Sequence, residues 1–171
     1  MLTINNINDK KYKKIIKPIM RHNVFKETYN IEHHGISRME HSLKVSYYSY
    51  KIALRLGLDY QSVARGGLLH DFYLCDNNRS NFSRFIDVFI HPKKTLATSK
   101  EYFTLNEIEE NIIESHMFPL YHRLPKYKES ILVSLVDKFI GSKEMLKSFR
   151  CRTIYKFKYT VLLLLIFITN N

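Results

Sequence analysis

The sequence has few of the residues that mark fibrous, disulfide-bonded or low-complexity proteins. Its 171 residues include five glycines, four prolines and no tryptophan, which excludes collagen-like and linker-rich classes. The two cysteines, Cys75 and Cys151, are too few for a disulfide framework and lack the spacing of a zinc-binding pair. The N-terminal residues contain no apolar segment of the kind found in signal peptides. We therefore expect a cytoplasmic protein in a reducing compartment.

Acidic residues and long apolar runs are also scarce. Sixteen Asp and Glu stand against 27 Lys and Arg, which gives a net charge of +11. The basic residues are scattered and form no nucleic-acid-binding motif, so we do not expect nucleic acid as the partner. The apolar run at residues 161–168 is less than half the length of about 20 residues that a spanning helix needs. We expect it to pack on the domain, and contact with a membrane or a second subunit is the alternative.

Apolar residues make up 45% of the chain, enough for one sizeable core. They recur at spacings of three and four, and no alternating pattern is long enough for a sheet. The sequence therefore predicts an all-α protein, a single-domain helical bundle. Expected helices cover 9–20, 37–57, a segment from Asp59 to about Phe72, a segment from Asn106, and 129–146.

Helix-capping residues support these boundaries. Ser37, Asp59 and Asn106 are typical N-caps, and Gly57 is a typical helix terminator. His91 followed by Pro92 predicts the start of a further helix that runs to about Phe103, since proline favours the first helical position.

Several segments each place an imidazole or a carboxylate on a helix face that should be buried. A lone inward histidine is more often a hydrogen-bonded core residue than a ligand. Their coincidence nevertheless favours one shared metal site, because buried carboxylates without a partner usually coordinate metals. A donor set of imidazoles and carboxylates without thiolate suits Fe, Mn, Ni or Zn. The residues are His41, His70, Asp71, His91, His116 and Asp137.

The order of these residues resembles the H…HD…D signature of the HD-domain superfamily of metal-dependent phosphohydrolases. The doublet His70-Asp71 lies in the segment Gly67-Leu-Leu-His-Asp-Phe, with His41 before it and Asp137 after it. The resemblance covers roughly residues 36–147. It implies that these four residues surround one divalent metal ion.

Two further histidines extend the resemblance to the binuclear members of this superfamily. His91, in a His-Pro pair, and His116 resemble the ligands of a second ion, which Asp71 would bridge to the first. Two divalent ions, among Fe, Mn, Ni, Zn and Mg, are therefore implied. The chain departs from the pattern at Met117, where cyclic-dinucleotide phosphodiesterases continue into a Gly-Tyr-Pro segment. It also has Leu74 where many binuclear members have a phosphate-binding lysine.

The resemblance implies hydrolysis of a phosphoester or phosphoanhydride, in a nucleotide or another small phosphorylated compound, by metal-activated water. Asp71 would orient the water, and Lys44 would assist at the phosphate. The expected substrate-binding residues are Lys44, Lys138, Arg38 and Arg65. Two alternatives stay open: a di-iron oxygenase of the HD type, and a non-catalytic module that binds a nucleotide for regulation.

This interpretation divides the chain into three parts. Residues 1–35 are expected to form a helix and loop packed on the core. Residues 36–147 would form the HD domain, and residues 148–171 a basic and apolar C-terminal helix.

Overall fold

Helices account for nearly all of the regular structure, which confirms the all-α prediction. The computed structural model describes residues 6–33, 36–73 and 81–169, with side chains except at 32–33, 81–90 and 151–169. A short antiparallel pairing joins its two strands, each two residues long. The elements are α1 (Lys10–Arg21), α2 (Asn23–Lys26), a 3-10 turn η1 (Glu27–Asn30), β1 (Glu32–His33), β2 (Ile36–Ser37), α3 (Arg38–Leu56), α4 (Tyr60–Leu69), α5 (Asn81–Tyr102), α6 (Glu107–Ser115) and α7 (Lys128–Thr169).

The predicted caps set the ends of three helices. The Ser37 side chain accepts a hydrogen bond from the Glu40 amide at the start of α3, and Gly57 ends this helix with a φ of 67°. The Asp59 side chain accepts hydrogen bonds from two backbone amides at the start of α4. Asn106 and Glu109 form a reciprocal capping box on α6. These side chains satisfy amides that a helix start leaves unpaired.

Helix α5 begins at Asn81, eleven residues before the predicted first helical position at Pro92. The expectation that His91 caps a helix and Pro92 opens it is wrong, because both residues lie inside a helix that starts at Asn81. A proline within a helix removes one backbone hydrogen bond, and the surrounding fold can tolerate this loss. His91 is thus held on a continuous helix.

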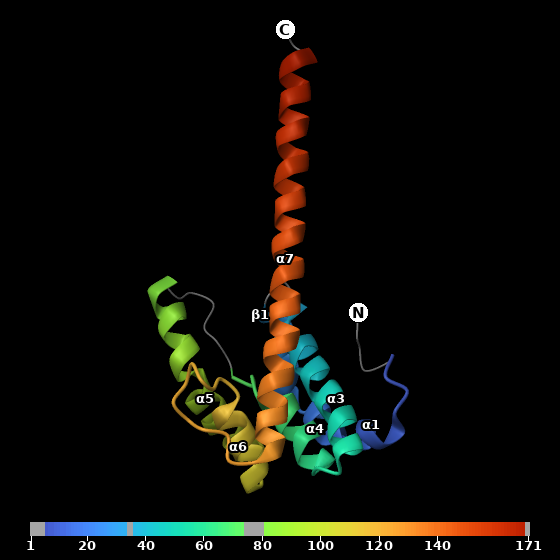
Figure 1. The fold of residues 1–171 in the computed structure, drawn as a ribbon, viewed down its shortest axis with the longest axis vertical. Helices are drawn as coiled ribbons and strands as arrows, with labels where there is room; N and C mark the ends of the chain where they lie inside the picture. Colours follow the sequence, from blue (N-terminus) through green and yellow to red (C-terminus); the bar gives the residue numbers. More distant parts are fainter. Residues whose placement is uncertain (1–5, 34–35, 74–80, 170–171) are drawn as a thin grey trace.

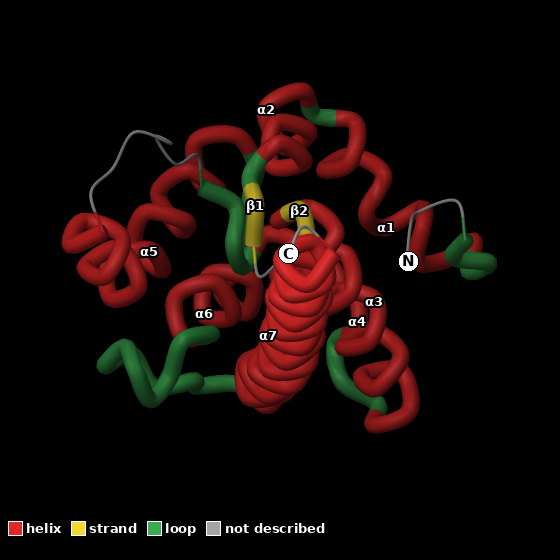
Figure 2. Tube along the Cα trace, turned by 90° about the horizontal axis from the view of Figure 1, so that it is seen from above, coloured by secondary structure: helices red, strands yellow, loops and turns green. Residues whose placement is uncertain are grey.

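Helix α7 is the longest element, and helices α3, α4 and α6 pack on its N-terminal part. Figure 1 shows that its C-terminal half extends far beyond the rest of the molecule. The helix is continuous across the expected boundary between residues 147 and 148. Viewed down α7, helices α3 and α4 lie on one side and α5 and α6 on the other (Figure 2).

Two apolar clusters hold the helices together. The first joins α1 to α3 and α4, and its buried members include Tyr12, Leu43 and Leu68. The second lies between α3, α4, α6 and α7, and includes Val45 and Ile112. The N-terminal helix is therefore part of the same packed core as α3 and α4.

A buried chain of hydrogen bonds links three helices in this core. The Tyr12 hydroxyl donates to Ser46 Oγ over 2.7 Å, and Ser46 Oγ donates to the Ala64 carbonyl over 2.6 Å. We expect Tyr12→Phe to lower the free energy of unfolding by about 1 kcal/mol, the net value of one such bond. Ser46→Ala should cost more, because it removes both hydrogen bonds and leaves the Tyr12 hydroxyl buried without its acceptor. Urea denaturation of the two variants tests this order, and equal losses would contradict it.

Candidate metal centre

Five helices bring the six predicted ligands to one place. His41 lies near the start of α3, and His70 and Asp71 directly follow α4. His91 lies within α5, His116 directly follows α6, and Asp137 lies within α7. The four imidazole rings form a continuous row in the order His41, His70, His116, His91, with neighbouring ring centres 5.4, 5.1 and 5.0 Å apart.

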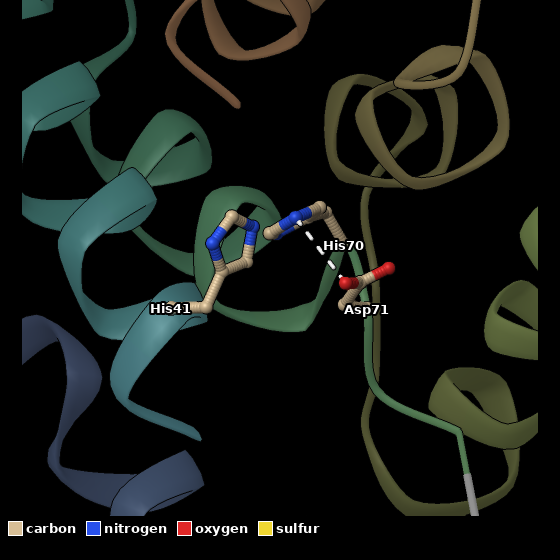
Figure 3. Close-up of side chains that lie close together, drawn as sticks. All are labelled: His41, His70 and Asp71. Carbon is tan, nitrogen blue, oxygen red and sulfur yellow. Dashed lines mark ion pairs between the residues drawn. The ribbon is translucent and has the colours of Figure 1, made fainter. Parts of the chain in front are cut away.

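One end of the row forms a first group of ligand atoms. Atoms of His41, His70 and Asp71 lie within 4.8 Å of one another, and all three residues are buried. Figure 3 shows the ring of His70 between His41 and Asp71. Asp137 Oδ1 lies 3.0 Å from His41 Nε2 and 3.4 Å from His70 Nε2, so it belongs to the same group. These are the four residues that the resemblance places around one ion.

The other end of the row forms a second group, which contains Asp71, His91 and His116. The Nε2 atoms of the two histidines lie 2.9 Å apart. Asp71 Oδ1 lies 3.5 Å from His91 Nε2 and 3.7 Å from His116 Nε2. The second oxygen of Asp71, Oδ2, points to the first group, 3.9 Å from His70 Nε2. The carboxylate of Asp71 therefore stands between the two groups.

Backbone carbonyls fix the orientation of two of these histidines. His70 Nδ1 donates to the Gly67 carbonyl over 2.8 Å, and His116 Nδ1 donates to the Ile113 carbonyl over 2.7 Å. With the proton on Nδ1, each ring presents the lone pair of Nε2 to the centre, as a metal ligand does. His70 Nε2 is buried and makes no hydrogen bond. The donor set and its orientation therefore fit divalent metal ions.

The charges of the two groups differ. Burial disfavours the charged form of His41, but its hydrogen bonds to Asp137 and Glu144 prevail and raise its pKa to about 10. Burial together with the neighbouring His70 and His91 lowers the pKa of His116 to about 3, so this ring is neutral at pH 7. Burial alone would raise the pKa of Asp137, but the histidines beside it lower that pKa well below its usual range. At pH 7 the first group thus pairs a protonated His41 with the ionised carboxylate of Asp137, and the second group contains a neutral imidazole.

Glu144 is a member of the site that the sequence analysis missed. Its Oε2 lies 2.8 Å from His41 Nδ1, on the opposite side of the ring from Asp137. Its Oε1 accepts from Lys44 over 2.9 Å, and Lys44 also pairs with Glu40. Glu144 lies seven residues after Asp137, and this spacing of two helical turns on one face was the available signal.

We expect Glu144→Gln to weaken metal binding at the first group by about 10- to 100-fold, the usual effect of removing a partner that orients a ligand histidine. Metal binding at the second group should be unchanged. The hydrogen bonds described above join His91 and His116 to each other and to the Ile113 carbonyl, and none of these bonds involves Glu144. Metal titration by calorimetry resolves the two affinities.

Glu109→Gln is the matched control for this variant. Glu109 is also buried, but it pairs with Arg65 and caps α6. Glu109→Gln should lower the free energy of unfolding and leave the metal affinities of the first and second groups unchanged. An equal loss of metal affinity in the two variants would show that general destabilisation is responsible.

The predicted substrate-binding residues occupy different surroundings. Lys138 Nζ donates to the carbonyl of the predicted ligand His116 over 2.8 Å. Arg38 donates to the Tyr73 carbonyl and lies over the Tyr73 ring, which in turn stacks on His91. Both side chains therefore lie next to the second group.

The other two basic residues have carboxylate partners. Lys44 pairs with Glu40 and Glu144 as described, beside the first group. Arg65 pairs with Glu109 and donates to the Thr104 carbonyl, near the start of α6. Leu74, the position of the departure from the binuclear pattern, lies outside the described residues. The roles of Asp71 and Lys44 in catalysis, and of all four basic residues in substrate binding, stay predictions.

Comparison with known proteins gives one match. The family model for the HD domain matches residues 38–141, a range that contains all six predicted ligands. Neither the curated proteins nor the solved structures contain a match to this chain.

Proposed function

The chain belongs to the HD domain family, and from this premise we propose that it is a metal-dependent phosphohydrolase that acts on a nucleotide or another small phosphorylated compound. The position of Asp71 is the observation that carries the proposal. One oxygen faces His70 in the first group, and the other faces His91 and His116 in the second. A carboxylate shared between two sets of histidines suits a pair of divalent ions.

Each group would hold one ion. His41, His70 and Asp137 would bind the first, His91 and His116 the second, and Asp71 both. Divalent ions supply a water of lowered pKa and offset the negative charge of a phosphoryl group. The chain itself keeps the ligands in place: the carbonyls of Gly67 and Ile113 orient two rings, and Glu144 orients His41.

Two basic side chains beside the second group support an anionic substrate. Burial lowers the pKa of Lys138, whose Nζ lies within hydrogen-bond distance of the carbonyl of a predicted ligand. The guanidinium of Arg38 is 4.1 Å from the centre of the Tyr73 ring. The net charge of +11 adds a general attraction for phosphorylated compounds, which increases the rate of encounter without selecting one compound.

Elemental analysis of the purified protein, followed by a panel of phosphomonoesters, phosphodiesters and nucleotides, tests the proposal. We expect about two equivalents of metal per chain and phosphate release that requires Mn or Mg. A protein that binds no divalent ion after reconstitution would overturn the proposal. Bound iron with a mixed-valent spectroscopic signal and no phosphate release would indicate the oxygenase chemistry instead.

A further inference from the structure

Helix α7 has a stripe of apolar side chains that are largely exposed to solvent. Leu135, Phe139, Leu146 and Phe149 are between 62% and 70% exposed, and Met145 beside them is 58% exposed. The first four recur at spacings of four, seven and three residues, so they lie on one face of the helix. Exposed apolar surface that continues along one face marks an interaction site.

This stripe lies on the opposite face of α7 from the candidate metal centre. Asp137 and Glu144, which contact His41, face inward, and Val133 and Ile140 pack on the same side. The helix also extends well beyond the other elements (Figure 1). A partner that binds the stripe can therefore approach without obstructing the six ligands.

Basic residues follow the stripe along the helix. Lys143, Lys147 and Arg150 are exposed beside it, and Arg152, Lys156 and Lys158 come next in the sequence. From residue 142 to the end of the sequence, the one acidic residue is Glu144, which is held by His41 and Lys44. Six positive charges against one negative charge favour an anionic surface as the partner.

The sequence beyond these basic residues distinguishes a bilayer from a second copy of the chain. Residues 161–168 are eight consecutive apolar residues, so a helix through them has no polar face. A second helix would cover one side of such a segment, whereas lipid covers every side. A parallel pair of α7 helices would also bring Lys143 and Arg150 of both copies close together, and their like charges repel.

The length of the apolar run agrees with partial insertion. Eight helical residues measure about 12 Å, against about 30 Å for the hydrocarbon core of a bilayer. Within the described residues no helix of the protein is long and apolar enough to cross a membrane. The run is therefore too short to span the bilayer and suits insertion into one leaflet by a helix that lies near the interface plane, with the lysines and arginines at the level of the headgroups.

We propose that α7, from Leu135 onward, lies along the surface of an anionic lipid bilayer and binds it through this apolar stripe, the basic residues 143–158 and the apolar run 161–168. The HD domain then stays on the water side, attached to the membrane by a rigid helix. The proposal is independent of the hydrolysis proposed above, because it concerns the opposite face of α7.

Sedimentation of the full chain with lipid vesicles tests this proposal. The protein should sediment with vesicles of phosphatidylcholine mixed with phosphatidylserine, and far less with phosphatidylcholine alone. The triple variant Lys143→Gln, Lys147→Gln, Arg150→Gln should bind the anionic vesicles about 100-fold more weakly, since each basic residue near such a surface strengthens binding several-fold. The double variant Leu146→Asp, Phe149→Asp should also lose binding, because it places charge on the apolar stripe.

The matched control is the triple variant Lys10→Gln, Lys14→Gln, Lys17→Gln. It removes the same three charges from exposed positions on α1 and should leave vesicle binding unchanged. An equal loss in the control would show that net charge alone is responsible and would overturn the proposal. A wild-type chain that stays in solution with both kinds of vesicle would also overturn it.

Analytical ultracentrifugation without lipid tests the alternative, in which a second copy of the chain binds the stripe. A dimer that Leu146→Asp, Phe149→Asp dissociates, in a protein that binds no vesicles, would assign the stripe to a second copy. Thermal unfolding and metal content of each variant verify that the domain is intact.

Discussion

Replacing Asp71 by asparagine should reduce the metal content from about two equivalents to one or fewer and lower hydrolysis by at least about 1,000-fold. The side chain keeps its shape but loses its charge and one of its two ligand oxygens. Since Asp71 Oδ1 faces His91 and His116 while Oδ2 faces His70, either orientation of the amide deprives one of the two groups of the oxygen that this side chain supplies. Asp71→Ala should remove both ions. Elemental analysis and phosphate release measure the two effects.

Asp59→Asn is the matched control for this variant. Asp59 caps the other end of α4, where its side chain accepts from the amides of Gln61 and Ser62. Asparagine is an equally good cap for the two amides, so this control should retain wild-type metal content and activity. If Asp71→Asn kept two tightly bound ions, Asp71 would not be the shared ligand and the proposed function would lose its main support.

Gly67→Val should lower the free energy of unfolding by about 2–3 kcal/mol and should also weaken metal binding. A Cβ atom at Gly67 would lie 3.1 Å from the Cα atom of Ser46, so α3 and α4 must separate to admit a side chain. The Gly67 carbonyl also orients the ring of His70. Urea denaturation with and without metal, together with metal titration, measures both effects.

Alanine variants of two glycines provide the comparison. A Cβ at Gly141, within α7, would have ordinary contact with His41 Cε1 at 4.0 Å. Gly141→Ala should therefore stabilise the protein by up to about 1 kcal/mol, the gain in helix propensity. Gly67→Ala should destabilise it, because the backbone of Ser46 cannot yield as a flexible side chain can. If Gly67→Ala and Gly141→Ala both raised the free energy of unfolding, helices α3 and α4 would not be in close contact at Gly67.

The sequence predicted those features that depend on neighbouring residues. Ser37, Asp59 and Asn106 each cap the helix that follows, because the interaction joins residues two or three positions apart. The inward histidines and aspartates were found because a charged or polar group on an apolar face conflicts with its surroundings. The match to the HD domain over residues 38–141 agrees with the order of those residues along the chain.

Features that depend on tertiary contacts escaped the sequence analysis. Pro92 gave the local signal of a helix start, but α5 continues through it from Asn81. Lys44 was expected at a phosphate, and its position between Glu40 and Glu144 depends on how α3 packs on α7. Glu144 was overlooked because a glutamate in a segment rich in lysine resembles a solvated surface residue.

The hydrogen bonds of His70 and His116 have a consequence for the order in which ligands bind. Both residues occupy the C-terminal ends of their helices, α4 and α6. Aligned peptide dipoles place about half a negative charge at each such end. The two helix ends therefore add their field to the charges of Asp71 and Asp137, which attracts cations and repels a phosphate. For the proposed hydrolysis we therefore expect metal to bind before a phosphorylated substrate, since the divalent cations would offset this negative potential.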